Sequence, residues 1–215
     1  MSRTDVELRP LADGQIAAAA WLLTEAMADN PTHVAVFGAR QGPRRRRLQR
    51  FFRAMLSHVQ RHGVLVGACE RDGALVGVMG ALRPGGCRSA GLQRLALGLR
   101  LVLGLRLALG LRPDVLLRTL RWLLAWQARD PARAHWHLGP LAVRPDRRGQ
   151  GLGARLLQDA LQRAEPSGLA SYLETDLPRN VALYRRFGFE VVAESPVLGL
   201  PHWFMQRAPH ASRNA

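Results

Sequence analysis

Between residues 138 and 157, an apolar stretch leads into a loop rich in arginine and glycine, and then into a second apolar stretch with helical spacing. Glycine occupies every second position near the end of this loop, at Gly149, Gly151 and Gly153. Where a strand passes through such a loop into a helix, backbone N–H groups are left unpaired at the positive end of the helix and can bind phosphate. The spacing differs from the dinucleotide fingerprint and from the P-loop, and no Lys-Ser or Lys-Thr pair follows. The loop therefore predicts a site for a phosphorylated ligand other than a nucleoside triphosphate.

A second group of residues suited to chemistry lies on neighbouring predicted elements. Asn180 and Tyr184 are four residues apart in a predicted helix, so they share one face of it. Glu174 stands near the end of the strand before that helix, and His135 and His137 alternate on one face of an earlier strand. Phenol, carboxyl and imidazole groups can all hold or pass a proton. These residues are therefore candidates for general acid and base catalysis.

Two motifs in these segments resemble those of a known family. Arg148, Gly151 and Gly153 fit the Arg/Gln-x-x-Gly-x-Gly/Ala pattern of the GNAT acetyltransferases, and residues 141–146 resemble the end of that family's fourth strand. Residues 172–191 resemble its fifth strand, the following helix and its sixth strand. Their amino-acid sequence is most similar to that of the puromycin N-acetyltransferase branch. The resemblance extends weakly over residues 5–207.

The resemblance implies an α+β fold. In it, a mixed, mostly antiparallel sheet is flanked by helices and splayed between its fourth and fifth strands. It also implies that acetyl-CoA is the co-substrate, with its diphosphate on the backbone N–H groups of the loop and its pantetheine arm along the open edge of the fourth strand. The break in that strand is expected at Gly139-Pro140, because proline cannot donate to a ladder. The residues implied to bind acetyl-CoA are Leu141, Ala142, Val143, Arg148, Gly149, Gln150, Gly151, Leu152, Gly153, Ala154 and Asn180.

For catalysis, the resemblance makes Tyr184 the candidate acid. A phenol with a pKa near ~10 can return a proton to a thiolate whose thiol has a pKa near ~8.5. Glu174 is the candidate that contacts the substrate or an activating water, while His135 and His137 are alternatives that could relay a proton through water. Two histidines without a third nearby ligand are a weak metal signal, and no metal site is predicted.

The sequence does not indicate a covalent intermediate. No serine lies in a Gly-x-Ser-x-Gly setting, and neither Cys69 nor Cys87 has neighbours typical of an activated thiolate. Two cysteines without a Cys-x-x-Cys pair also argue against disulfides and zinc. Direct attack by an amine in a ternary complex is therefore the expected mechanism.

Composition favours one domain over residues 1–207 with a flexible tail at 208–215, since the chain has 215 residues and 47% hydrophobic content. The formal net charge is +15, and all 31 basic residues are arginine. A complete absence of lysine is what a GC-rich coding sequence produces, so this charge is weak evidence for nucleic-acid binding. No aromatic stacking platform accompanies the arginines either.

Periodicity and turn signals predict the elements that position these residues. The expected strands cover residues 6–10, 63–70, 74–82, 134–143, 170–175, 189–193 and 202–207, and the expected helices cover 13–27, about 45–59, 151–164 and 178–187. A helical insertion is expected over about 84–132, with a helix starting at Pro113 and a repeated heptapeptide at 94–100 and 106–112. The sequence contains no run of about eighteen uncharged apolar residues, which is the length needed to span a membrane.

The expected function is therefore acetyl-CoA-dependent N-acetylation of a primary amine of a small molecule, such as a xenobiotic or antibiotic. Two alternatives stay open: acetylation of a protein or peptide, and a non-catalytic acyl-CoA-binding module with a regulatory role. A cytoplasmic location is expected, because no signal peptide is visible and the thiols are expected to be reduced. The segment with the repeat is expected to cover the sheet and wall the substrate cleft; the alternative is an amphipathic surface for a homodimer partner or for lipid headgroups.

Overall fold

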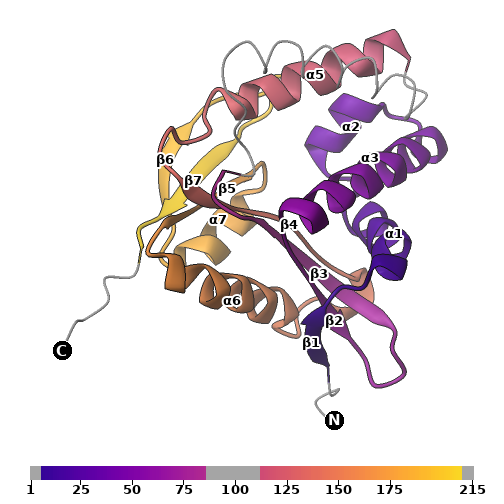
Figure 1. Cartoon of the computed structure of the whole chain (residues 1–215). Coiled ribbons are helices and arrows are strands. Elements are labelled where there is room, and N and C mark those ends of the chain that lie inside the picture. The colour runs from indigo at the N-terminus through magenta and orange to yellow at the C-terminus, as the bar shows by residue number, and fades with distance from the viewer. Residues whose placement is uncertain (1–5, 86–111, 210–215) are drawn as a thin grey trace.

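The computed structural model describes residues 6–85 and 112–209 (Figure 1). Within these ranges, one seven-stranded mixed sheet forms the centre of the molecule, in the order β1-β2-β3-β4-β5-β7-β6. Neighbouring strands are antiparallel except β4 and β5, which run parallel. The strands are β1 (Glu7–Pro10), β2 (Gly63–Cys69), β3 (Leu75–Leu82), β4 (His135–Val143), β5 (Ala170–Thr175), β6 (Glu190–Glu194) and β7 (Trp203–Arg207).

Helices cover both faces of the sheet and give the predicted α+β architecture (Figure 1). On one face lie α1 (Ile16–Met27) and α3 (Gln41–His62), with α2 (Pro31–Phe37) and α5 (Pro113–Gln127) packed beyond them. On the other face lie α6 (Leu152–Ala164) and α7 (Pro178–Arg185). Successive residues of a strand enter opposite cores, as Val78 and Met79 of β3 do.

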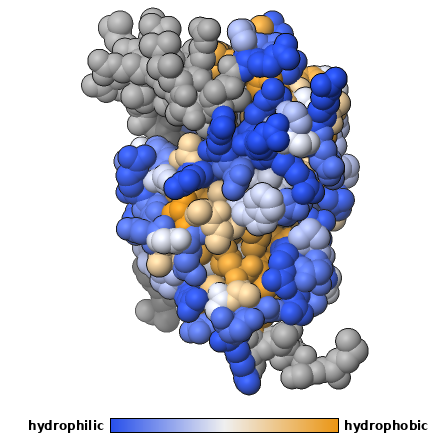
Figure 2. Space-filling model, turned by 90° about the vertical axis from the view of Figure 1, so that its right-hand side faces the viewer, coloured by the Kyte–Doolittle hydropathy of each residue, from blue (hydrophilic) through white to orange (hydrophobic). Residues whose placement is uncertain are grey.

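The amphipathic pattern predicted for α3 is confirmed. Its apolar residues Leu48, Phe52 and Leu56 are buried in the core beneath α1, while Arg46 and Arg53 are exposed. Figure 2 shows the side of the molecule on which α1 and α3 lie, where hydrophilic residues surround a narrow apolar strip. Arg46 and Arg53 therefore belong to a solvated helix face, whereas Arg44 is buried and donates to the Ala28 carbonyl oxygen.

The predicted strands all form, with ends shifted by at most one residue. The sequence missed α2, because Pro31 was interpreted as a signal that ends the first helix. The structure ends α1 at Met27, as predicted, and a separate helix follows, at whose start the Asn30 side chain accepts hydrogen bonds from the N–H groups of Thr32 and His33. Proline is tolerated in a first helical turn, where its missing N–H would be unpaired anyway, so the same residue begins a new helix.

The insertion is described only in part. A helix begins at Pro113, as predicted, and forms α5. The repeats within 94–112 lie outside the described residues except for Arg112, and the predicted tail is described only to Pro209. Along the described ranges, no helix has both the length and the apolar character needed to cross a bilayer.

The predicted splay between β4 and β5 is confirmed. Their parallel pairing covers only His135–His137 against Ala170–Tyr172, and the two strands separate beyond it. The register between β3 and β4 shifts at Gly139-Pro140, where the sequence predicted the break. Gly80 of β3 lies against this irregularity, since a Cβ there would come 2.7 Å from the Gly139 carbonyl oxygen. The close approach of the β3 backbone to Gly139 requires glycine at position 80. It keeps β4 paired with β3 while β4 bends away from β5.

Candidate active site

The loop between β4 and α6 presents a row of backbone donors. A 3-10 turn (Pro145–Arg147) follows β4, and α6 begins at Leu152 with Gly151 as its N-cap residue. Gly149 and Gly151 have φ angles of 76° and 78°, a left-handed conformation that favours glycine. The backbone N–H groups of residues 149–154 donate no hydrogen bond to any described residue. The positive end of α6 therefore offers several donors to an anionic ligand.

Arginine side chains hold this loop in place. Arg148 donates from Nη2 to the Ala26 carbonyl oxygen at 2.7 Å, and this bond ties the loop to the end of α1. Arg147 forms an ion pair with Glu70 at the end of β2, and Arg144 lies 3.9 Å from the same carboxylate. Much of the positive charge that the sequence places here is thus paired within the protein. The arginines position the backbone donors before a ligand arrives, which lowers the cost of ordering them.

One edge of β4 is open after the splay, and its register decides which residues face that edge. Arg144 donates its N–H to the Val76 carbonyl oxygen at 2.8 Å. Because bonded pairs alternate in an antiparallel ladder, Ala142 also directs its backbone toward β3, whereas Leu141 and Val143 direct theirs away from it. Leu141 and Val143 therefore offer N–H and C=O groups to an extended ligand, and Ala142 does not.

Tyr184 reaches this region from α7. The residue is buried, with 8% of its surface exposed, and its ring packs 6.0 Å from that of Phe189. Its hydroxyl makes no hydrogen bond to the described residues. Burial, together with the negative charges of Glu174 and Asp176, raises the pKa of Tyr184 to about 12. The phenol therefore keeps its proton at all ordinary pH values, and the same shift makes it a weaker acid toward a thiolate.

Asn180 lies one helical turn before Tyr184 and joins α7 to β5. Its Nδ2 donates to Thr175 Oγ1 at 3.0 Å, and the Leu177 N–H donates to the same oxygen at 3.3 Å. These two bonds fix the start of α7 against the end of β5. The Asn180 amide therefore sets the position of Tyr184, and its carbonyl oxygen can still accept a hydrogen bond.

Glu174 and His137 meet where β4 and β5 separate. Glu174 Oε2 lies 2.9 Å from His137 Nε2, and the Glu174 side chain is only 3% exposed. The other carboxylate oxygen, Oε1, is buried and has no hydrogen-bond partner among the described residues. A buried oxygen of this kind can accept a proton from a ligand that enters beside it.

His137 also connects Glu174 to Asp130, a residue that sequence reasoning missed. Asp130 Oδ1 lies 3.5 Å from His137 Nδ1 and 3.2 Å from His135 Nε2. Burial by itself would raise the pKa of Asp130, but the contacts with His135 and His137 outweigh it and hold that pKa well below its usual range. The only signal in the sequence is an acidic residue five positions before His135, in a loop whose path periodicity does not predict.

Asp176, at the end of β5, holds α2 against the site. Its carboxylate accepts from Asn30 Nδ2 at 2.8 Å and from Thr32 Oγ1 at 2.6 Å. Thr32 Oγ1 also lies 3.3 Å from Nε2 of His202, which is fully buried. The Asp176 carboxylate thus joins β5 to α2, Thr32 links α2 to the segment before β7, and the carboxylate adds negative charge near Tyr184.

Replacing Asp176 with alanine should lower the free energy of unfolding by about 2 kcal/mol, because it leaves the buried Thr32 hydroxyl and the Asn30 amide without their acceptor. Urea denaturation followed by circular dichroism measures this change. Asp159→Ala is the matched control, since Asp159 pairs with Arg163 one turn away on the surface of α6. That variant should lose at most about 0.5 kcal/mol, and equal losses in the two variants would contradict the role of Asp176.

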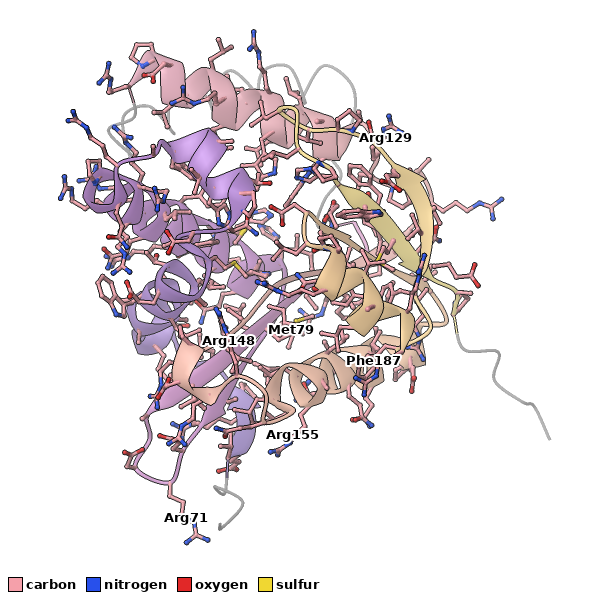
Figure 3. All side chains as sticks on the ribbon, turned by 180° about the vertical axis from the view of Figure 1, so that it is seen from behind. Arg71, Met79, Arg129, Arg148, Arg155 and Phe187 are labelled. Atoms are coloured by element: carbon pink, nitrogen blue, oxygen red, sulfur yellow. The ribbon has the colours of Figure 1, made fainter. Side chains whose placement is uncertain are left out.

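Side chains from distant parts of the sequence thus converge around the open edge of β4. Figure 3 shows Arg148 and Phe187 on opposite sides of Met79 of β3 in that view, and Arg129 near the far end of the sheet, where the chain approaches β4. Glu174 and Tyr184 come from β5 and α7, and the glycine loop follows the other end of β4. The arrangement combines an anion-binding loop, an open strand edge, a protonated phenol and a buried carboxylate.

A search against family models finds a match to the acetyltransferase (GNAT) family over residues 35–189. Among curated proteins, the chain is 40% identical over 60 residues to an L-methionine sulfoximine/L-methionine sulfone acetyltransferase of Pseudomonas aeruginosa. That match covers 26% of this chain and 35% of the relative, so the chain matches only about a third of the relative's length.

Solved structures share the fold over nearly the whole chain. A Corynebacterium glutamicum protein described as a histone acetyltransferase and related acetyltransferase has a TM-score of 0.70 at 23% identity, with 97% of this chain and 98% of that chain covered. A phosphinothricin acetyltransferase from Sinorhizobium meliloti, in complex with acetyl-CoA, has a TM-score of 0.58 at 18% identity, with 98% and 91% covered.

Proposed function

The chain belongs to the acetyltransferase (GNAT) family, and we propose that within it the protein transfers an acetyl group from acetyl-CoA to the primary amine of a small molecule. The family match covers residues 35–189 and confirms the resemblance found in the sequence. One observation carries the proposal: the unpaired loop amides, the open edge of β4, the Tyr184 phenol and the Glu174 carboxylate surround the same splayed pair of strands.

The chain's residues fit acetyl-CoA in two respects. The amides of residues 149–154 would bind its diphosphate, and a Cβ at Gly149 or Gly151 would meet nothing within 4 Å, so room is available there. Leu141 and Val143 would pair with the amides of its pantetheine arm, as a further strand would. The related fold from Sinorhizobium meliloti, in complex with acetyl-CoA, supports the same assignment. When bound, acetyl-CoA supplies a reactive acetyl thioester.

The two proton-transfer roles go to residues on opposite sides of the splay. Tyr184 holds a proton on its hydroxyl, because burial and nearby carboxylates raise its pKa to about 12, and it donates that proton to the departing thiolate. Glu174 accepts the proton of the attacking amine at Oε1, directly or through a water. His137 donates to Oε2 and thereby holds the carboxylate in one orientation. The amine then attacks directly, and no side chain of the protein is acetylated.

The charges around the site favour an acceptor that carries an amine. Although the chain has a formal net charge of +15, the Tyr184 phenol lies in the negative field of Glu174 and Asp176. Negative charge attracts a protonated amine toward the site. The curated Pseudomonas aeruginosa relative carries the name of an acetyltransferase for L-methionine sulfoximine and L-methionine sulfone, and both are small amines. The negative field suits any amine acceptor, and the name of the relative favours a small-molecule acceptor over a peptide or a non-catalytic role. The cytoplasmic location and the homodimer stay predictions.

Release of free coenzyme A in the presence of a panel of amines tests this proposal. We expect thiol release with at least one class of small primary amine, faster than the background hydrolysis, and mass spectrometry should show the matching N-acetyl product. If only basic peptides accelerate release, the protein is an acetyltransferase, but the proposal of a small-molecule acceptor is wrong. If nothing accelerates release while acetyl-CoA binds tightly, the protein is an acyl-CoA-binding module.

Replacing Gly151 with alanine should weaken acetyl-CoA binding by about tenfold, because a side chain there resists the left-handed conformation that aims the loop amides. Isothermal titration calorimetry measures the Kd. Gly168→Ala is the matched control: Gly168 has a φ of 63°, has nothing within 4 Å of an added Cβ, and follows the other end of α6. Both variants should lose similar stability, but only Gly151→Ala should lose affinity. Equal Kd values in the two variants would contradict the loop's role.

A further inference from the structure

Three electron-donating atoms converge between the loop before β4 and the first residues of β4. Asp130 Oδ1, His135 Nε2 and His137 Nδ1 all lie within 4.8 Å of one another. The carboxylate oxygen is 3.2 Å from His135 Nε2 and 3.5 Å from His137 Nδ1. Neither Asp130 Oδ1 nor His135 Nε2 has an aligned hydrogen bond among the described residues, although both atoms are fully buried.

The outward-facing nitrogens of both imidazoles are already engaged. His135 Nδ1 lies 2.8 Å from the Arg133 carbonyl oxygen, and His137 Nε2 lies 2.9 Å from Glu174 Oε2. Both acceptors lack a proton, so each of these ring nitrogens carries the N–H and donates it. The ring of Tyr172 packs against both imidazoles, with centroid distances of 5.5 and 5.4 Å, and fixes their planes.

This engagement decides what faces the space between the three atoms. When each neutral imidazole donates through its outer nitrogen, the inner nitrogen presents a lone pair. His135 Nε2 then presents a lone pair to the Asp130 carboxylate oxygen, and the two atoms repel unless a cation lies between them. The side chain of His135 is only 4% exposed, which prevents bulk water from screening the repulsion. The cation is either a metal ion or a proton on one imidazole.

We propose that Asp130, His135 and His137 form a binding site for a divalent transition metal ion, with zinc the best fit. The donor set of two imidazoles and one carboxylate matches the borderline character of zinc, whereas calcium and magnesium prefer oxygen ligands throughout. Zinc with ligands at about 2.0–2.1 Å in tetrahedral geometry places its donor atoms about 3.3 Å apart. The contacts of 3.2 and 3.5 Å from Asp130 match this spacing, and all three donor atoms lie within 4.8 Å of one another.

The surroundings have the features of metal sites whose ligands are held by their neighbours. Metal-bound histidines almost always donate their other N–H to a carbonyl or a carboxylate. Arg133 and Glu174 provide these acceptors here. The Asp130 and His137 side chains are 15% and 21% exposed, so an ion can enter from solvent and a fourth position can hold water. Asp130 is the third nearby ligand that the sequence did not reveal.

The site does not depend on the proposed acetyl transfer, because metal binding can be measured without acetyl-CoA. The full chain is treated with a chelator and then titrated with zinc chloride alone in a calorimeter. We expect one zinc ion per chain at this site, and X-ray absorption should report two imidazole ligands. Asp130→Asn and His135→Gln should each raise the zinc Kd by more than about 100-fold, and Glu174→Gln should raise it by about 10- to 100-fold through His137.

A matched control separates this site from chance histidine pairs. His58 and His62 lie one turn apart on α3 with ring centroids 4.6 Å apart, so they could hold zinc weakly at the surface. His62→Gln should leave the tight site intact. Circular dichroism on the metal-free proteins verifies folding, and Asp130→Asn keeps the test valid if His135→Gln does not fold. Binding that survives Asp130→Asn, binding that disappears in His62→Gln, or no zinc binding at all would overturn the proposal.

Discussion

Replacing Tyr184 with phenylalanine is expected to lower kcat by about 10²- to 10³-fold, the range of general acid catalysis. The phenol is the group that would return a proton to the thiolate, and its hydroxyl makes no hydrogen bond to the described residues. Its removal therefore costs little structure. The Kd of acetyl-CoA and the midpoint of thermal unfolding should change little, so the loss appears in kcat and not in binding. Steady-state kinetics combined with calorimetry measures both quantities.

The expected dependence of activity on pH follows from the direction in which the pKa of Tyr184 is shifted. Burial and nearby carboxylates raise the pKa of Tyr184 to about 12, so the phenol stays protonated as the pH rises through its ordinary value of 10.0. Activity should therefore not fall between pH 8 and pH 10 through loss of the acid. Tyr172→Phe is the control, because it removes the chain's other phenol, whose hydroxyl donates to the Arg129 carbonyl oxygen. Tyr172→Phe should lower kcat far less than Tyr184→Phe does. Unchanged turnover in Tyr184→Phe would exclude the phenol as the acid.

Replacing Glu174 with glutamine is expected to lower kcat/KM by about 10²-fold at neutral pH, since an amide cannot take the proton of the attacking amine. Glutamine keeps the shape of the side chain and can still accept from His137, so the fold should persist. The deficit should shrink as the assay pH approaches the pKa of the amine, because the acceptor then arrives already deprotonated. A pH profile of kcat/KM for both proteins measures this convergence.

Glu190→Gln is the control for that experiment, because Glu190 is an exposed residue of β6. It should leave the pH profile unchanged. A purely structural role for Glu174 predicts a deficit that is the same at every pH. A constant deficit would therefore contradict its assignment as the base.

The sequence predicts the elements that follow strong local signals. The Asp-Gly pair at residues 72–73 fixes the hairpin between β2 and β3, and the apolar stripe of α6 fixes the face that it buries. Gly139-Pro140 reveals the break in β4, because proline has no N–H to give to the ladder. Gly149 and Gly151 reveal the turn into α6, because both positions need the left-handed conformation. Each of these signals acts over a few residues.

Sequence reasoning fails where long-range contacts decide. Asp130 gains its role only when the loop before β4 folds back onto the histidines of that strand. Asp176 contacts Asn30 and Thr32 across more than 140 positions of the chain. The sequence around Asp176 and the sequence around Asn30 do not indicate that these residues meet. The register of β4 likewise directs the backbone N–H and C=O groups of Ala142 toward β3, whereas those of Leu141 and Val143 face the open edge. The periodicity of the sequence does not show which alternate residues face that edge.

Hydrogen exchange of the full chain, followed by mass spectrometry with and without saturating acetyl-CoA, tests the central claim most directly. We expect the amides of residues 149–154, and those of Leu141 and Val143, to exchange more slowly when acetyl-CoA is present, because the ligand accepts their hydrogen bonds. Protection should be weaker in Gly151→Ala and unchanged in Gly168→Ala. Binding of acetyl-CoA that leaves exchange in this loop and along β4 unaltered would contradict the account.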